Sequence, residues 1–468
     1  MMKKLITLLL TLTILASVFV LPSAALTDTE AAAFKYTLIM QSSNGLSYTG
    51  DDSLFYGKYQ MRGMAISQDG KYAFGGYLNP KGSSAIEMSE IATGKVVAGF
   101  QFVQPDGSVS YPKGLATDDR GYFYAALAWY PNYGRADIAA FTFDNNTIKQ
   151  IGYANIVTTS DSVKTGVNGI TVEKLNGNYY AYVVVNYDVD YLARFNVTDP
   201  ANPVLDTAFG EGGLIDLQKE PYSLKEGNYL DVDTDGTIYL AGNNSAGAKV
   251  LVLSSDGSLI LNEFAHDTAY GVAIWNNYLF VTTQKTGKVG IYDKTLLTPV
   301  ANIEVTADNT NLPISRDDIL IAVGVNSLCN AAVVNDILFL GDQGSGQAGL
   351  DQIFAVGLTA DAAAVVDACA KGIHDRLAAA YPEKTEAPDT TEAPATTDEA
   401  TKAPEATTDA PEATDAPEAT DAPTAAPEQT PAPGTEAPAE EKGCGGFVAG
   451  AAMIVAILGT AVVFKKRD

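Results

Sequence analysis

Aromatic and amide side chains gather in six short loops of this chain. An aromatic ring can stack on the apolar face of a sugar, while amides and carboxylates bond to its hydroxyls. The same residue types are enriched at protein interfaces, so a protein ligand stays open. The chain holds 24 Tyr in all, which leaves a purely structural role as the alternative. The loops are Tyr77-Leu78-Asn79-Pro80, Trp129-Tyr130-Pro131-Asn132-Tyr133, Asn186-Tyr187-Asp188-Val189-Asp190, Asn243-Asn244-Ser245, Gln284-Lys285-Thr286 and Asp342-Gln343-Gly344-Ser345.

A second candidate is a run of three aspartates. Asp231, Asp233 and Asp235, followed by Gly236, have the D-x-D-x-D-G spacing of a calcium loop. The twelfth position of such a loop would be Gly242 rather than Glu. Asp-Gly is also ordinary turn chemistry between two strands. We therefore predict a turn and no cofactor, with calcium at the three aspartates as the alternative.

Acid–base chemistry has few candidates. The chain has only two histidines, His266 and His374, which excludes a histidine-rich metal site. A Ser-His-Asp triad could use His266, but no G-x-S-x-G motif accompanies it, so a structural histidine is favoured. Asp188 or Asp190 could act as an acid or base, although the sequence pairs neither carboxylate with a second group. Whether the protein is an enzyme stays open, and a binding role is favoured.

The elements that must position these loops form a repeat. Short runs rich in Val, Ile, Tyr and Phe are broken by Asp-Gly, Asn-Gly and Asn-Asn turns, which predicts a strand, a tight turn and a second strand. The copies start about 40–60 residues apart, close to the period of a propeller blade. They lie at residues 62–74, 113–124, 168–182, 230–240, 271–281 and 330–340.

Six copies predict an all-β fold, a six-bladed β-propeller over residues 34–358. The last copy lacks a clear fourth strand, while residues 36–40 offer a spare one near the start of the mature chain. Pairing the two would close the ring and remove its open edges. Residues 359–381 are predicted to form a helix whose apolar stripe packs on the propeller; its members are Val365, Val366, Cys369, Ile373 and Leu377.

The copies resemble bacterial six-bladed propellers of the NHL and gluconolactonase-like kind. Residues 205–213, Leu-Asp-Thr-Ala-Phe-Gly-Glu-Gly-Gly, are similar to a motif of repeat propellers in bacterial surface proteins. The gluconolactonase-like resemblance implies a divalent metal held by Glu, Asn and Asp near the starts of the inner strands. Only Asn168 fits that set, so we do not carry the activity over. The matching positions are Arg62, Lys113, Asn168, Tyr229 (register open), Tyr270 and Cys329.

The sequences at both ends of the chain predict a protein of the cell surface. Residues 1–25, with two lysines, an apolar core and a small-residue site at 23–25, predict a secretory signal peptide; an uncleaved anchor is the alternative. Residues 447–464 carry no charge over 18 residues, which predicts a transmembrane helix. The basic residues in 465–468 place that tail in the cytoplasm. Residues 443–446 resemble the anchors of surface proteins from anaerobic Gram-positive bacteria.

Composition separates a stalk from the globular part. Residues 382–442 hold 16 acidic residues and three lysines, a net charge of −13 and half of the total of −26. Such a Pro-, Thr- and Ala-rich acidic segment is predicted to be disordered and extended. The acidic balance of the rest argues against nucleic acid as a partner. Cys329 and Cys369 are expected to be separate buried thiols, with a disulfide as the alternative.

These observations predict a single-pass membrane protein with an extracellular propeller that binds a surface glycan or an extracellular protein. One alternative is a surface hydrolase or lyase acting on a polysaccharide or lactone at the mouth of the channel. Another is a scaffold that packs neighbouring surface proteins. The predicted ligand-binding residues are Arg62, Tyr77, Lys113, Trp129, Tyr130, Tyr133, Asn168, Tyr187, Asp188 and Tyr270.

Overall fold

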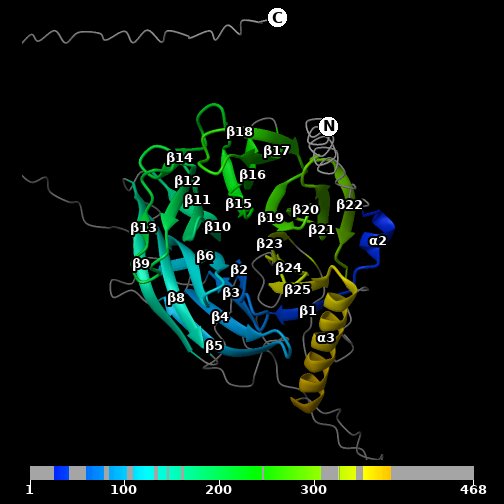
Figure 1. The fold of residues 1–468 in the computed structure, drawn as a ribbon. Helices are drawn as coiled ribbons and strands as arrows, with labels where there is room; N and C mark the ends of the chain where they lie inside the picture. Colours follow the sequence, from blue (N-terminus) through cyan, green and yellow to red (C-terminus); the bar gives the residue numbers. More distant parts are fainter. Residues whose placement is uncertain are drawn as a thin grey trace, which may run out of the picture. The chain divides into compact units, whose positions relative to one another are not determined.

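The described part of the chain is a ring of antiparallel sheets (Figure 1). A computed structural model describes residues 26–41, 60–78, 84–102, 109–130, 135–144, 147–159, 163–244, 247–306, 325, 327–343 and 351–380. The side chains of Trp129 and Tyr130, and all of Tyr133, lie outside this set. So do the predicted signal peptide, stalk, transmembrane helix and tail. Among the described residues, no helix is both long and apolar enough to cross a membrane.

Six sheets form the ring, which confirms the six-bladed β-propeller. The innermost strands contact one another in the order β2, β6, β10, β15, β19, β23 and back to β2. From the inside outwards, blade 1 is β2 (Met61–Ile66), β3 (Tyr72–Tyr77), β4 (Ser84–Glu90) and β5 (Lys95–Phe102); blade 2 is β6 (Val109–Thr117), β7 (Tyr122–Tyr130), β8 (Arg135–Asp144) and β9 (Thr147–Thr158); blade 3 is β10 (Thr165–Leu175), β11 (Asn178–Tyr187) and β12 (Tyr191–Asn196), with β13 (Val204–Leu205) and β14 (Leu214–Asp216) both paired to β12.

The second half of the ring repeats this order. Blade 4 is β15 (Glu226–Val232), β16 (Ile238–Asn244), β17 (Gly247–Leu253) and β18 (Ile260–Ala265); blade 5 is β19 (Ala269–Trp275), β20 (Tyr278–Thr283), β21 (Lys288–Asp293) and β22 (Pro299–Glu304); blade 6 is β23 (Leu328–Val334), β24 (Ile337–Asp342), β25 (Gln352–Gly357) and β1 (Tyr36–Gln41).

The predicted closure of the ring is confirmed. Strand β1, from the start of the described chain, pairs antiparallel with β25 as the outermost strand of the last blade, with Tyr36 opposite Val356. All six residues of β1 are buried. Because the first and last parts of the sequence share one sheet, the ring cannot open without breaking that sheet.

The core lies between neighbouring blades, because both faces of each sheet are covered. Between blades 1 and 2, Phe123 stacks on Phe74 at 4.8 Å and on Phe141 at 4.6 Å between ring centroids. Strand β11 shows the same burial, with Ala181 to Val185 fully enclosed. The apolar runs in the sequence are therefore inter-blade contacts, as the strand pattern predicts.

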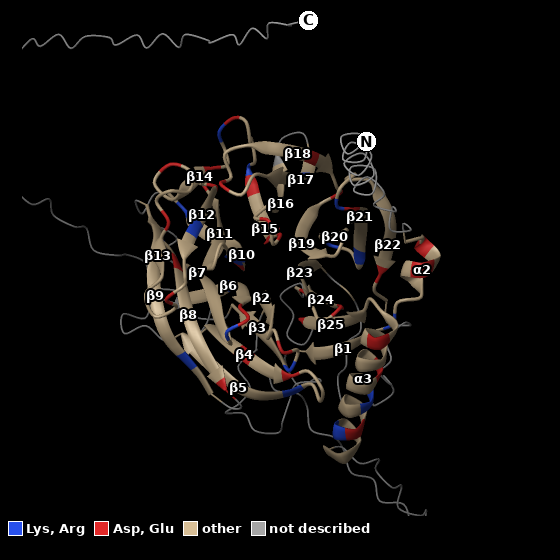
Figure 2. Ribbon diagram, viewed as in Figure 1, with Lys and Arg blue, Asp and Glu red and all other residues tan. Residues whose placement is uncertain are grey.

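Helix α3 (Ala360–Ala380) confirms the predicted C-terminal helix and packs against β1 and β25. The Thr359 hydroxyl accepts a hydrogen bond from the Ala362 amide at 3.2 Å and so caps its start. Val366, Ile373 and Leu377 are buried as expected, but Val365 is 50% exposed and does not belong to the stripe. A short helix, α2 (Asp28–Ala32), lies over β22. Figure 2 shows acidic positions on α2 and both charge signs along α3.

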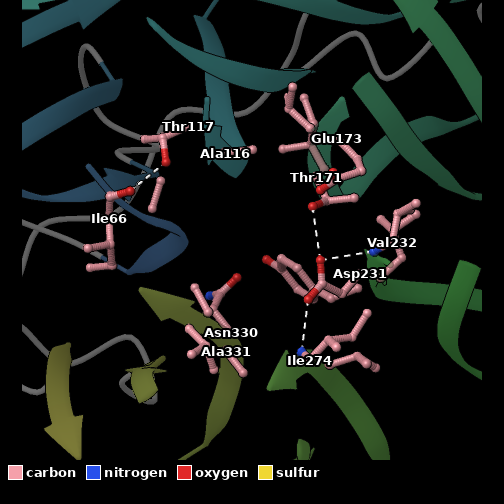
Figure 3. A pocket seen from close by; sticks show the side chains of 18 of the residues that line it. Ile66, Ala116, Thr117, Thr171, Glu173, Asp231, Val232, Ile274, Asn330 and Ala331 are labelled. Carbon is pink, nitrogen blue, oxygen red and sulfur yellow. Dashed lines mark hydrogen bonds between the residues drawn. The ribbon is translucent and has the colours of Figure 1, made fainter. Parts of the chain in front are cut away.

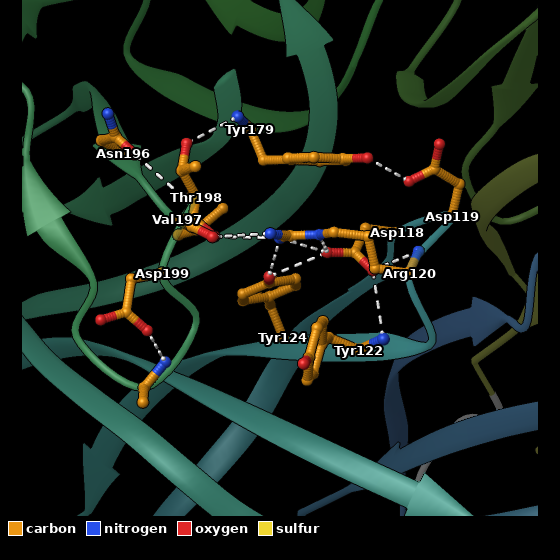
Figure 4. Close-up of polar contacts among 11 residues, drawn as sticks. Asp118, Asp119, Arg120, Tyr122, Tyr124, Tyr179, Asn196, Val197, Thr198 and Asp199 are labelled. Carbon is orange, nitrogen blue, oxygen red and sulfur yellow. Dashed lines mark hydrogen bonds and ion pairs between the residues drawn. The ribbon is translucent and has the colours of Figure 1, made fainter. Parts of the chain in front are cut away.

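Polar clips hold neighbouring blades together at the hairpin turns (Figure 4). The guanidinium of Arg120, in the turn between β6 and β7, donates to the Asp118 carboxylate at 2.6 Å and to the Thr198 carbonyl of blade 3 at 2.7 Å. It also lies 3.6 Å from the centroid of the Tyr179 ring. Arg194 repeats the arrangement between blades 3 and 4, bonding Asp206 and the carbonyl of Ser255.

The two cysteines of the globular part are separate, buried thiols, which confirms the expectation and excludes the Cys329–Cys369 disulfide. Cys329 lies on β23 beside the channel and Cys369 on α3. Burial raises the pKa of both thiols. Neither has the lowered pKa or the exposure of a reactive cysteine.

Candidate functional site at the mouth of the channel

Each innermost strand carries a β-bulge at the same height. The ladder to the second strand shifts between Met61 and Gly63 in blade 1 and between Gly227 and Leu230 in blade 4. In each blade two consecutive residues of the inner strand therefore stand opposite one residue of the second strand. The first residues of these six pairs are Arg62, Lys113, Asn168, Asn228, Tyr270 and Cys329.

Blade 4 departs from the position expected from the sequence. Asn228, not Tyr229, matches Asn168, because Tyr229 occupies the place that glycine takes in four other blades. Those glycines are required by close approach: a Cβ on Gly114 would lie 2.5 Å from the Asn168 carbonyl oxygen. The alternation of residues within a strand does not reveal where a bulge lies. The sequence therefore could not predict that Asn228, one residue before Tyr229, holds this position.

Tyr229 closes the channel. Its hydroxyl lies 2.5 Å from the carbonyl oxygen of Arg62 and 2.8 Å from that of Lys113, on the opposite side of the ring. Asn330, which also replaces the bulge glycine, donates from Nδ2 to the same Arg62 carbonyl at 3.2 Å. These two side chains form a floor that divides the channel into two halves.

The half at the starts of the inner strands gathers side chains from all six blades. Lys113 is 5% exposed, and its ammonium lies 4.9 Å from the centroid of the Tyr187 ring on blade 3. The pKa of Lys113 is lowered to about 7, first by burial and then by the charge of Arg62. Glu226 of blade 4 and Cys329 of blade 6 have the opposite effect and raise the pKa of Lys113. Tyr270 of blade 5 completes the group, with its ring 5.5 Å from that of Tyr229.

Several buried polar atoms at this mouth have no protein partner in the described part of the chain. Lys113 Nζ also lacks an acceptor among the described residues, but this atom is not itself one of the buried ones. The side-chain oxygens of Asn168 and Asn186 are buried and accept no hydrogen bond from the described residues. A buried polar group without a partner costs about 1–3 kcal/mol, so such a cluster is expected where a ligand supplies the partners.

Tyr187 has an unusual backbone. It is 41% exposed at the end of β11 and has φ of +92°, a conformation that residues with side chains rarely adopt. Strain of this kind costs about 1–3 kcal/mol and persists where the surroundings impose it, often at binding sites. Here it holds the exposed ring against the ammonium of Lys113.

The other predicted residues lie in several places. Asp188 is exposed, and its carboxylate accepts a hydrogen bond from the Lys164 amide at 2.8 Å. Tyr77 is only 1% exposed, and burial together with Glu87 and Asp351 raises its pKa, so its side chain is inside the protein rather than on the face. Trp129 and Tyr130 end β7, and their side chains, like all of Tyr133, are outside the described set.

No catalytic pair is found among the described candidates. Asp190 is fully buried and accepts hydrogen bonds from the Gly227 amide at 3.2 Å and from Gln218 Nε2 at 2.9 Å. It therefore joins blade 3 to blade 4; burial raises its pKa to about 6. His266 is structural, because its two ring nitrogens bond the hydroxyls of Tyr292 and Thr283, and burial lowers its pKa to about 4.

The half of the channel beyond the floor contains a cavity of about 290 Å³ (Figure 3). The second half of every inner strand contributes to it, and Tyr229 lines its closed end. Its acidic side chains are Glu173, Asp231 and Asp233. Burial raises the pKa of Glu173 to about 7, and the charges of Asp231 and Asp233 act in the same direction. The sequence analysis did not single out Glu173, because its neighbours come from another blade.

The three aspartates considered for calcium have separate tasks. Asp231 accepts hydrogen bonds from the Thr171 hydroxyl at 3.2 Å and the Ile274 amide at 2.9 Å, and so joins three blades. Asp233 pairs with Lys294 at 2.5 Å. Asp235 accepts from the Thr237 amide at 2.8 Å. The segment is the predicted turn between β15 and β16, and no cluster of metal-ligating side chains occurs among the described residues.

Glu173→Gln is expected to stabilise the protein at alkaline but not at acidic pH. The folded state holds the Glu173 proton up to about pH 7, whereas an unfolded glutamate releases it near pH 4.3. The raised pKa therefore lowers stability as pH rises through this range. Because Glu173 is partly exposed, we expect a gain of about 1–2 kcal/mol at pH 8 and none below about pH 4. Urea unfolding of both proteins at the two pH values measures it. An equal gain in stability at the two pH values would contradict the raised pKa of Glu173.

Comparisons with known proteins identify no family. No family model and no curated protein matches the chain. Among solved structures, it is similar to a nidogen/laminin complex (15% identity, TM-score 0.37, 54% of this chain and 82% of that one). It is also similar to a protein of unknown function from Bacteroides thetaiotaomicron (14%, 0.43, 69% and 76%) and to Myxococcus xanthus glutaminyl cyclase (9%, 0.33, 69% and 96%). We draw no functional conclusion from likenesses this distant.

Proposed function

We propose that this protein is a ligand-binding β-propeller whose binding site is the mouth of the channel at the starts of the inner strands. The observation that carries the proposal is the contact between Lys113 and Tyr187. The Lys113 ammonium, which bonds no acceptor in the described part of the chain, lies against a partly exposed aromatic ring held at φ of +92°. Both features cost free energy in the unliganded protein, and a ligand at the mouth would offset that cost.

A glycan suits this site better than a flat protein surface. Tyr229 and Asn330 reach across the channel beneath the mouth, to the carbonyl of Arg62. The Tyr187 ring can stack on a sugar, and the orphan oxygens of Asn168 and Asn186 can accept from hydroxyls. Trp129 and Tyr130, which end the second strand of blade 2, and Tyr133, three residues later in the sequence, are included in the proposed site, and so is Asp188, next to Tyr187. Tyr270 lines its wall.

The setting that we propose is the outside of a cell. The predicted signal peptide at residues 1–25 and the apolar segment 447–464 support it, with the acidic segment 382–442 as the proposed spacer. The resemblance of the repeats to NHL and gluconolactonase-like propellers and of residues 443–446 to anchors of Gram-positive bacteria agrees with this setting. The alternative of a surface hydrolase or lyase gains no support from Asp188 or Asp190, whose carboxylates bond the backbone amides of Lys164 and Gly227.

Tyr187→Ala is expected to weaken glycan binding about tenfold, since a stacking ring contributes about 1.4 kcal/mol. The measurement is binding of the full chain to a glycan array, followed by titration of the strongest hit. Tyr187→Phe is the matched control, because it keeps the ring and should bind like the wild type. The double variant Trp129→Ala/Tyr130→Ala tests the loop of blade 2. Binding that is unchanged in Tyr187→Ala would contradict the proposed site, and binding to proteins alone would favour a protein partner.

A further inference from the structure

The proposed mouth carries an excess of positive charge within an acidic protein. Arg62 and Lys113 lie close enough for their charges to interact, while the chain as a whole has a net charge of −26. The nearby acidic side chain is Glu226, whose carboxylate is 3.5 Å from Asn243 Nδ2 and forms no ion pair with either cation within the described structure. A buried charge is costly unless it is paired. No residue in the described part of the protein therefore supplies Lys113 with a counter-anion.

Two acceptors that lack donors lie on blade 3, next to the blade of this cation. Asn168 occupies the bulge position on blade 3 that Lys113 occupies on blade 2, and its backbone touches Gly114. Its Nδ2 donates to the Gly227 carbonyl at 2.7 Å, which leaves the oxygen for another donor. Asn186 precedes Tyr187, whose ring faces Lys113. The mouth thus needs an anion and hydroxyl donors at the same time.

We propose that the mouth binds an acidic carbohydrate, with the carboxylate of a uronic acid unit against Lys113 and Arg62 and its hydroxyls against Asn168 and Asn186. This inference rests on the proposed function and narrows the class of its ligand. A neutral sugar would leave the ammonium without an anion. An acidic peptide would also supply carboxylates, but its donors would be backbone N–H groups, because its carboxylate side chains only accept; a uronic acid unit carries hydroxyl donors on the same ring as its carboxylate.

Binding should be linked to proton uptake. The free Lys113 amine has a pKa of about 7, and a carboxylate held against it would restore its ordinary pKa near 10. At pH 8 binding should therefore take up a proton at Lys113. The other titratable groups that face Lys113 are Glu226, Tyr187, Tyr229, Tyr270 and Cys329; burial raises the pKa of the last three, so these stay protonated at pH 8.

The test uses the full chain and a panel of uronate oligosaccharides, each paired with its carboxyl methyl ester and with its carboxyl-reduced neutral form. We expect at least one uronate to bind, with at least tenfold weaker binding of its ester and its reduced form. Lys113→Met should lower the affinity at least tenfold, whereas Lys149→Met, which removes an exposed lysine on β9, should not. Calorimetry in two buffers of different ionisation enthalpy should show the proton uptake at pH 8 in the wild type, even if Lys113→Met fails to fold.

The outcomes separate the two proposals. Equal binding of a uronate and its ester, or unchanged binding by Lys113→Met, would overturn the acidic class while the glycan site stands. Binding of poly-L-glutamate without binding of any uronate would overturn the carbohydrate class. Failure of every acidic and neutral glycan to bind would remove the proposed glycan function as well. Binding without proton uptake at pH 8 would show that the carboxylate does not contact Lys113.

Discussion

Tyr229→Ala should destabilise the propeller by about 3 kcal/mol and open the floor of the channel. The Tyr229 side chain is 8% exposed and reaches across the ring to the carbonyls of Arg62 and Lys113. Its removal takes the hydroxyl from both carbonyls, of which that of Arg62 keeps its bond from Asn330, and leaves a space between the two halves of the channel. Water from either half can enter that space, which keeps the cost near the lower end for a large aromatic residue. Denaturant unfolding measures the loss.

A second readout distinguishes an opened floor from general destabilisation. Cys329 packs with Tyr229 and Tyr270 and is 1% exposed. In Tyr229→Ala its thiol should react faster with a small alkylating reagent under native conditions. Tyr229→Phe is the matched control: it keeps the ring, loses only the hydroxyl and should cost about 1 kcal/mol without exposing the thiol. Equal losses for the two variants, with Cys329 still protected, would contradict the role of Tyr229 as the floor.

Arg120→Met should lower stability by about 3 kcal/mol, because breaking a buried ion pair leaves the buried Asp118 carboxylate without its cation, although hydrogen bonds from Tyr124 and two backbone amides remain. The side chain of Asp118 is 1% exposed and that of Arg120 is 22% exposed. The guanidinium also bonds two carbonyls of blade 3 and stacks on Tyr179. Methionine preserves the apolar stem, so the loss reports the clip between blades 2 and 3. Unfolding in urea with and without the substitution measures it.

Blade 1 provides the control for this clip. Lys71 pairs with Asp69 at the same spacing in the equivalent turn, but both side chains are exposed, at 69% and 49%. Lys71→Met should therefore change stability by less than about 0.5 kcal/mol. Adding Asp118→Asn to Arg120→Met should recover part of the loss, because the buried charge is removed with its partner. If Lys71→Met and Arg120→Met have the same effect, burial does not govern the strength of these clips.

The architecture could be predicted because its signals are local. Strand–turn–strand units appear as short apolar runs around Asp-Gly and Asn-Asn turns, and each copy becomes the inner pair of a blade. The closure by β1 followed from counting strands, since the last copy needs an outer partner. Helix α3 followed from its 3.6-residue periodicity, and only Val365 was placed on the wrong face.

The site could be predicted only in part. Arg62, Lys113, Asn168, Tyr187 and Tyr270 do meet at one mouth, because equivalent positions in a cyclic repeat converge on its axis. The contacts among these residues join different repeats, so no single repeat of the sequence predicts them. Tyr77 shares the loop chemistry of the others but is buried.

The sequence by itself determined the number of blades, the order of strands, the closing pair and the height at which the candidate residues lie. The tertiary structure alone decided that Asn228 rather than Tyr229 holds the bulge position, that Tyr229 closes the channel, and that Lys113 has no acceptor among the described residues. The physical reason is distance along the chain. Tyr229 is separated by 167 residues from Arg62 and by 116 from Lys113. Patterns within a repeat fix strands, whereas burial, hydrogen-bond partners and pKa values depend on which repeats face each other.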